Sequence, residues 1–263
     1  PFVRTQVAWL KLHRCNWEGV DADIEATLHA VREGKRAGPP LDLLAMTGSA
    51  EDQLGCARTF ATHMYPPPPA TLWQGERYGN PRIRIAYLSA DFRDHPVSYL
   101  IAGLLERHDR SRFETFGLAL EPQGASRLGA RVKDAFEHFS VVKEMGDEDI
   151  ARLLREQQID IAVDLMGHTT FARPNVFALR PSPAQVGYLG FPATAGTHFL
   201  DYIIADAYVI LAGMERHYAE KVVRLPDTFQ CNDAKRSAAA RAPSRPDAGL
   251  PPEGVIYCCF NPS

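Results

Sequence analysis

The residues of this chain best suited to chemistry lie in the segment 82–107, RIRIAYLSADFRDHPVSYLIAGLLER. The apolar residues of 83–88 predict a buried strand, and a polar loop leads from it to His95 and Pro96, which begin an amphipathic helix. The N–H groups at a helix start favour anions and a neutral rather than a charged imidazole. His95 is therefore a candidate catalytic base, or a residue that holds polar groups of a ligand, at the carboxyl edge of a sheet. The alternative is a structural histidine that caps the helix.

Two further polar loops follow predicted strands in the same way. His168 and Thr169 come after the apolar run 159–165, and the loop 189–196, LGFPATAG, comes after the run 185–188. Loops that follow the strands of a parallel sheet lie on one edge, so we expect all three loops to meet at one crevice. Alternatively, the histidine loop only caps the turn after it, and LGFPATAG is an ordinary loop with glycine and proline.

Other residues are weaker candidates. Gly190 and Gly196 would let the backbone approach a ligand closely. Asp164 ends a predicted strand, where it either orients a neighbouring group or bonds to backbone amides. We expect His198 and His217 to be surface or packing residues. No GxGxxG follows the first strand, and neither GxxxxGK[ST] nor GxSxG occurs, which disfavours a nucleotide-dependent oxidoreductase or epimerase.

Length and composition set further limits. The chain has 263 residues, of which 45% are hydrophobic and 23% charged, with a formal net charge of −3. This is typical of a soluble globular protein and provides no basic field for nucleic acid. No apolar run reaches the roughly 18 residues of a membrane span, and no signal peptide opens the chain. The five cysteines lack CxxC spacing and the nine histidines lack HExxH, so we expect no disulfide framework, no metal site and a reducing, cytoplasmic compartment.

The elements that must position the candidate residues alternate along the middle of the chain. Apolar runs predict strands, and they are separated by segments of helical periodicity. The expected strands are 83–88, 113–119, 139–142, 159–165, 185–188, 202–205 and 222–224, and the expected helices are 97–107, 126–136, 147–157 and 171–178. This alternation predicts an α/β fold with a Rossmann-like, doubly wound parallel sheet.

The chain divides into five segments by composition and periodicity. Residues 1–65 read as helical, with helix pairs of a size that suggests helical-repeat stacking, and 66–80 as a Pro-rich linker. A Rossmann-like lobe is expected at 81–227, followed by a polar linker at 228–254. The last segment, 255–263, begins with an apolar strand and resembles the start of a truncated second lobe.

Three long segments resemble the family that contains O-GlcNAc transferase and the plant SPINDLY-type O-fucosyltransferases. They are RIRIAYLSADFRDHPVSYL, DIAVDLMGHTTFARPNVFALRPSPAQVGYLGFPATAGTHFLDYIIAD and YAEKVVRLPDTFQCND. The helical start resembles the end of a tetratricopeptide array, so the resemblance covers nearly the whole chain. It implies a GT-B glycosyltransferase with two Rossmann-like lobes, in which the second lobe binds most of the nucleotide-sugar. The implied reaction is inverting transfer to Ser or Thr hydroxyls of a protein or peptide acceptor, with no obligatory metal and no cofactor besides the donor.

The resemblance also assigns roles to residues of the three loops. His95 matches the active-site histidine of an HP motif, which is a candidate base. His168 and Thr169 match the GHT or GYT loop beside the cleft. The residues that match the loop closing on the donor sugar are Leu189, Gly190 and Pro192.

The donor sugar stays open at this point. The O-GlcNAc transferase pattern has Gly where this chain has Ala193, and a second His where it has Tyr99. GHT and LPDTF favour the SPINDLY-like side, whereas His95-Pro96 favours the O-GlcNAc side. We expect UDP-GlcNAc, with GDP-fucose or UDP-glucose as alternatives.

The end of the chain departs most from the family pattern. In the family, a strand like 255–260 continues into a segment whose Lys neutralises the leaving phosphates, whereas this chain stops at Ser263. We therefore expect a missing C-terminal lobe as a partner, and little or no activity of this chain by itself. The rival interpretation is a non-catalytic module that binds a protein.

Overall fold

The computed structural model describes residues 2–236 and 240–258. By its internal contacts the chain divides into two compact units, Pro1–Asp233 and Ala234–Ser263. All the candidate site residues lie in the first unit.

The first unit begins with helices, as predicted for 1–65. They are α1 (Arg4–His13), α2 (Val20–Arg32), α3 (Pro40–Leu43) and α4 (Ala50–Met64). Helix α4 starts at Ser49, whose side chain accepts a hydrogen bond from the Asp52 N–H. The Asp52 carboxylate in turn binds both Nε and Nη2 of Arg32 in α2, at 2.9 and 2.7 Å. This two-pronged ion pair joins α2 to α4.

A parallel sheet of seven strands follows in the described part of the chain, so the predicted fold class is confirmed. Its order is β3-β2-β1-β4-β5-β6-β7. The strands are β1 (Ile83–Ser89), β2 (Phe113–Ala119), β3 (His138–Val141), β4 (Ile161–Asp164), β5 (Ala184–Gly187), β6 (Tyr202–Ala205) and β7 (Lys221–Arg224). The strand order reverses between β1 and β4, which is where α/β sheets bind ligands.

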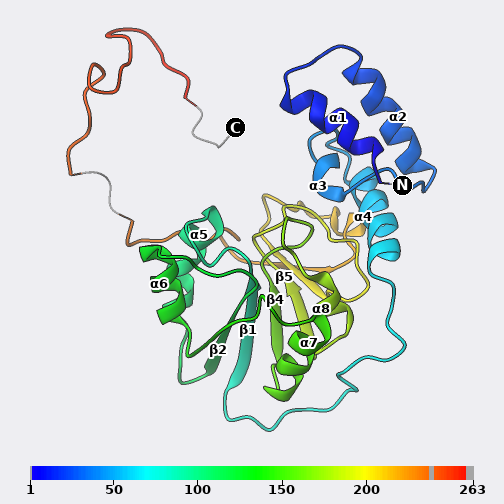
Figure 1. Cartoon of the computed structure of the whole chain (residues 1–263), viewed down its shortest axis with the longest axis vertical. Coiled ribbons are helices and arrows are strands. Elements are labelled where there is room, and N and C mark those ends of the chain that lie inside the picture. Colours follow the sequence, from blue (N-terminus) through cyan, green and yellow to red (C-terminus); the bar gives the residue numbers. More distant parts are fainter. Residues whose placement is uncertain (1, 237–239, 259–263) are drawn as a thin grey trace. The chain divides into compact units, whose positions relative to one another are not determined.

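Helices cover both faces of this sheet (Figure 1). They are α5 (Pro96–Leu105), α6 (Arg127–Ala135), α7 (Asp147–Glu156) and α8 (Pro174–Ala178), and a short 3-10 helix, η1 (Glu215–His217), precedes β7. Side chains alternate between the faces of a strand. In β1, Ile85 and Tyr87 pack in one core with residues of α5 and α6, whereas Ala86 and Leu88 pack in a second core with residues of α7 and α8. Burial on both faces explains why the central strands are apolar throughout.

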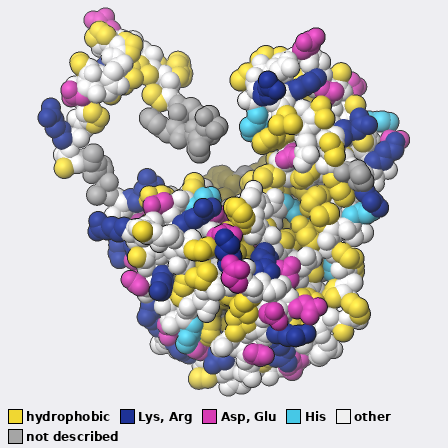
Figure 2. All heavy atoms as spheres, viewed as in Figure 1, with side chains coloured by type: hydrophobic (Ala, Val, Ile, Leu, Met, Phe, Trp, Pro, Cys, Tyr) yellow, Lys and Arg dark blue, Asp and Glu magenta, His cyan; other side chains and the backbone are white. Residues whose placement is uncertain are grey.

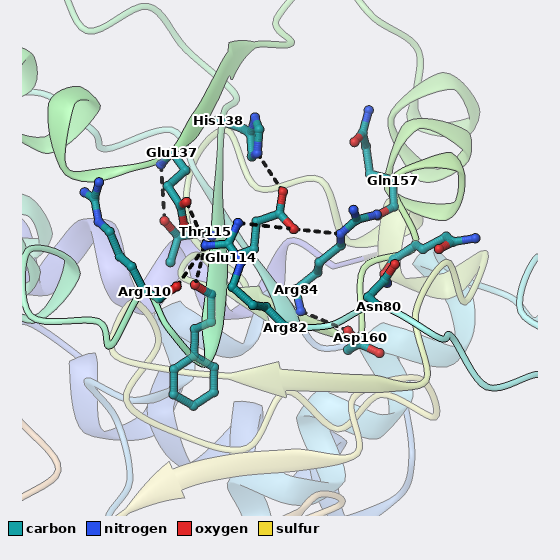
Figure 3. Close-up of polar contacts among 12 residues, drawn as sticks. Asn80, Arg82, Arg84, Arg110, Glu114, Thr115, Glu137, His138, Gln157 and Asp160 are labelled. Atoms are coloured by element: carbon teal, nitrogen blue, oxygen red, sulfur yellow. Dashed lines mark hydrogen bonds and ion pairs between the residues drawn. The ribbon is translucent and has the colours of Figure 1, made fainter.

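Charged side chains tie β1, β2 and β3 together near their amino ends (Figure 3). Arg84 Nε lies 3.0 Å from Glu114 Oε2, and His138 Nε2 lies 2.8 Å from Glu114 Oε1. Arg82 Nη1 binds Glu137 Oε2 at 2.8 Å. These contacts link neighbouring strands at the edge opposite the candidate site. They therefore help to fix the register of the strands and take no part in the candidate site.

The structure changes some predicted elements. The helix expected at 171–178 begins only at Pro174, because Phe171 has a φ of 66°, which is incompatible with a right-handed helix. The strand expected at 255–260 is wrong for 255–258, and its last two residues lie outside the described residues. Val255 and Tyr257 are 82% and 95% exposed, and residues 255–258 form no strand. The predicted domain boundaries stay predictions.

The surface of the first unit carries no single sign of charge on the face shown in Figure 2, where basic and acidic side chains are interspersed. Among residues 2–236 and 240–258, no helix is both long enough and apolar enough to cross a membrane.

Candidate active site

The three polar loops leave the sheet from neighbouring strands. In the parallel register Leu88 of β1 pairs with Asp164 of β4, and Asp164 pairs with Gly187 of β5. The loops that begin after these strands therefore start side by side at the carboxyl edge. That all three loops meet at one crevice stays a prediction. What each residue does in a reaction stays a prediction.

His95 is placed at the start of α5, where it is the N-cap. Its Nδ1 lies 3.3 Å from the Val97 N–H, which donates to it, and 3.5 Å from Asp91 Oδ2. The side chain is 36% exposed, so the ring reaches solvent at this edge. His95 therefore caps the helix through Nδ1, and its exposed ring could also contact a substrate.

The two neighbours of His95 Nδ1 require different tautomers. When Nδ1 accepts from Val97, a neutral ring carries its proton on Nε2 and cannot accept another there. A proton on Nδ1 points instead to the Asp91 carboxylate and leaves the Nε2 lone pair bare. A base acting through Nε2 therefore needs the second tautomer, which the Asp91 carboxylate 3.5 Å away is placed to favour.

Asp91 is a residue that sequence reasoning missed. It is buried, and its backbone is held by Ser89 Oγ, which accepts from the Asp91 N–H at 2.9 Å, and by the Ser98 hydroxyl, which donates to the Asp91 carbonyl at 2.6 Å. The Arg93 guanidinium lies 3.4 Å from its Oδ1. The available signal was the spacing of four residues between Asp91 and His95 across a short polar loop.

His168 lies between two loops and a helix rather than in open solvent. Its Nε2 is 2.7 Å from the Ala195 carbonyl oxygen, which can only accept, so the proton sits on Nε2. Burial lowers the pKa of His168 and keeps the ring neutral. Its Nδ1 is buried with no hydrogen-bond partner among the described residues. The ring packs against Phe60, Tyr65 and Phe191, with centroid distances of 5.4, 6.1 and 5.2 Å.

The turn that carries His168 is held by Asp164. The two carboxylate oxygens accept from the N–H groups of Met166 and Gly167 at 2.9 and 3.1 Å. Of the two predicted roles for Asp164, the structure therefore shows the bonding to backbone amides. The Thr169 hydroxyl donates to the Met166 carbonyl at 2.9 Å, so it caps this turn and keeps its lone pairs free to accept.

Asp164 should make the stability of this chain depend on pH. Burial raises its pKa from an ordinary value near 3.8 to about 6. Between about pH 4 and pH 6 the folded chain then holds a proton that the unfolded chain has lost, so its contribution to the unfolding free energy falls as the pH rises, by up to about 3 kcal/mol. Denaturant titrations across this range should show a smaller fall of the unfolding free energy with pH in Asp164→Asn. Equal slopes for both proteins would contradict the assignment.

The loop LGFPATAG begins with a tight turn. Leu189 has a φ of 66°, and the Gly190 N–H donates to the Tyr188 carbonyl at 2.7 Å. A Cβ on Gly190 would lie 1.7 Å from the Leu165 carbonyl oxygen, so only glycine fits. Pro192 is exposed. Leu189 and Pro192 line an apolar cavity of about 120 Å³ together with residues of β6.

Glu220 holds the other end of this loop through hydrogen bonds, and the sequence analysis did not identify it. Its Oε1 accepts from the Ala195 N–H at 2.7 Å, and its Oε2 accepts from the Thr194 hydroxyl at 2.6 Å. Thr194 Oγ1 accepts in turn from the N–H groups of Gly196 and Ala219. Glu220 is buried, and burial raises its pKa. No local pattern marks it, because it directly precedes β7 and meets its partners 25 and 26 residues back along the chain.

Within the described part of the chain, no group of three or more His, Cys, Asp or Glu side chains could hold a metal ion. The buried carboxylates instead accept hydrogen bonds within the protein: Asp164 from two backbone N–H groups, and Glu220 from one backbone N–H and one hydroxyl. The basic side chain of the first loop is Arg93, whose Nε is buried without a partner in the structure as described.

A doubly wound sheet with polar loops at its switch point is the architecture of an α/β lobe that binds ligands in the crevice outside the carboxyl ends of its strands. The model of Glycosyl transferase family 41 matches residues 67–240. The chain belongs to this family, and the resemblance inferred from its motifs is confirmed.

Relatives with curated names are much longer than this chain. A probable UDP-N-acetylglucosamine–peptide N-acetylglucosaminyltransferase SEC of Arabidopsis thaliana is 34% identical over 230 residues, which is 84% of this chain and 24% of that protein. The probable enzyme SPINDLY of the same plant is 31% identical over 197 residues, covering 74% and 21%. The chain thus spans about a quarter of the length of these relatives.

A solved structure shares the fold. It is an O-GlcNAc transferase mutant, K341M, of Thermobaculum terrenum, which superposes with a TM-score of 0.67 at 27% sequence identity. The match covers 82% of this chain and 42% of that one.

Proposed function

We propose that this chain forms the N-terminal lobe of a protein O-glycosyltransferase that moves GlcNAc from UDP-GlcNAc to Ser or Thr hydroxyls. The observation that carries the proposal is His95 at a helix start, on the same sheet edge as the His168 and LGFPATAG loops. The names of the curated relatives, which are UDP-N-acetylglucosamine–peptide N-acetylglucosaminyltransferases, support the donor and the acceptor class.

In the proposed reaction the acceptor oxygen attacks the anomeric carbon of the sugar. The new C–O bond forms as the bond to the diphosphate breaks, and the hydroxyl proton passes to His95 Nε2. A hydroxyl is a weak acid, so attack gains from a base that accepts this proton as the bond forms. Asp91 holds the tautomer that leaves Nε2 bare, and the diphosphate leaves with the electron pair of the broken bond. This chemistry uses no cofactor besides the donor.

The second lobe supplies most of the donor contacts in this proposal, and the chain by itself has little or no activity. The proposed compartment is the cytoplasm. Support comes from the cysteines of the described part of the chain, Cys15, Cys56, Cys231 and Cys258, all of which are unpaired.

The donor is tested by titrating UDP-GlcNAc, UDP-glucose and GDP-fucose into the two-lobed protein, meaning this chain together with its second lobe, in a calorimeter. We expect UDP-GlcNAc to bind most tightly, by at least about tenfold, or roughly 1.4 kcal/mol. This chain without the second lobe is the control and should show no binding.

Two results would revise the proposal. Tighter binding of GDP-fucose would make the protein an O-fucosyltransferase, which the GHT and LPDTF motifs favour. Failure of all three donors to bind would overturn the enzymatic function and leave a protein-binding module.

A further inference from the structure

Helix α4 is in direct contact with the His168 loop and with the LGFPATAG loop. The Phe60 ring meets the His168 ring edge to face, with centroids 5.4 Å apart and planes at 86°. Tyr65, directly after the helix, lies nearly parallel to the same imidazole at 6.1 Å and also meets Phe199 edge to face at 6.3 Å. The imidazole of the GHT loop is therefore enclosed by residues of the helical segment on one side and by Phe191 on the other.

The backbone of α4 also touches the backbone of the LGFPATAG loop. A Cβ on Gly196 would lie 2.5 Å from the Ala57 carbonyl carbon and 2.6 Å from the Arg58 nitrogen. Gly196 further has a φ of 65°, which an L side chain rarely adopts. Two backbones approach this closely only when a glycine lies between them, so the loop and the helix are fitted to each other.

The contacts form one continuous unit. His168 Nε2 donates to the Ala195 carbonyl, and Ala195 precedes the glycine that meets α4. On its other side α4 packs into the helical segment, because Cys56 shares a core cluster with Ala30 and Leu43. Helix α4 thus joins helices α2 and α3 to both loops.

We propose that α4 is a positioning element of the transferase site, in which Phe60 and Tyr65 set the geometry of the donor-side loops through His168. This inference rests on the proposed function. If the inference is right, a displacement of α4 also displaces the LGFPATAG loop, which it contacts at Gly196. The helical segment would then affect the binding of the donor sugar. The competing interpretation is packing that only stabilises the fold.

The test compares Phe60→Ala and the milder Phe60→Leu with Thr62→Ala, which changes an exposed residue of the same helix. The first measurement follows the His168 ring by NMR during a pH titration of this chain. Burial lowers the pKa of His168. Opening the aromatic enclosure hydrates the ring, so the pKa should rise toward 6.5 in Phe60→Ala, less in Phe60→Leu, and not in Thr62→Ala.

The second measurement is steady-state transfer by the two-lobed protein. We expect the donor KM to rise about three- to tenfold in Phe60→Ala, the size of one lost aromatic contact, while the acceptor KM stays unchanged. Phe60→Leu should show the same selective effect at smaller size, and circular dichroism reports the folded fraction of each variant. A pKa of His168 that does not move, or an unchanged donor KM in an active protein, overturns the positioning role. Absence of transfer by the unmutated two-lobed protein overturns the proposed function itself, and this inference with it.

Discussion

Replacing His95 with alanine in the two-lobed protein should lower kcat by about 10²- to 10⁴-fold, the range that a general base contributes. The expected loss follows from the proposed reaction, in which the imidazole accepts the proton of the attacking hydroxyl. Initial rates at saturating UDP-GlcNAc and acceptor peptide measure it. His198→Ala, at an exposed position, is the matched histidine control and should keep the wild-type rate.

The cap role of His95 must be separated from its role as a base, because alanine removes both. Loss of an N-cap costs about 0.5–2 kcal/mol of stability, and asparagine is among the best caps. His95→Asn therefore keeps an acceptor for the Val97 N–H and removes the imidazole. We expect His95→Asn to be as slow as His95→Ala but more stable to denaturant. Wild-type turnover in His95→Asn would show that His95 only caps α5.

Replacing Gly190 with alanine should lower the unfolding free energy by about 2–4 kcal/mol. The new methyl group would lie 1.7 Å from the Leu165 carbonyl oxygen and 2.4 Å from its carbon. These are backbone atoms at the end of β4, so the clash is relieved only by moving a strand end or the LGFPATAG loop. The donor-side loop should therefore be displaced as well as the fold weakened. Denaturant unfolding of the chain measures the loss.

Gly187→Ala is the matched control for Gly190→Ala. It lies three residues earlier, in β5, and a Cβ there would meet only the Leu200 Cδ1 at 3.6 Å and the Tyr202 carbonyl oxygen at 3.9 Å, which are ordinary contacts. Its unfolding free energy should be unchanged or slightly higher. Equal destabilisation by the two substitutions would contradict the steric argument.

Much of the fold was predictable because its signals are local. The apolar strand 83–88 and the helical periodicity after Pro96 place His95 at a helix start without any knowledge of distant residues. The order of strands and helices then places the loops after β1, β4 and β5 at one edge of a parallel sheet. The strand expected at 255–260 shows the limit of such patterns, because an apolar run needs a neighbouring strand to pair with, and 255–258 has none.

The sequence by itself determined the fold class, the family and the loops that carry the candidate residues, because each depends on patterns within a few tens of residues. Only the tertiary structure decided how those loops are held. It placed the His168 ring beside Phe60 and Glu220 against Thr194. Those contacts depend on which side chains the packed chain brings within a few ångströms of one another, and neither residue type nor spacing encodes a contact between residues 26 or 108 positions apart, as in the Glu220–Thr194 and Phe60–His168 pairs.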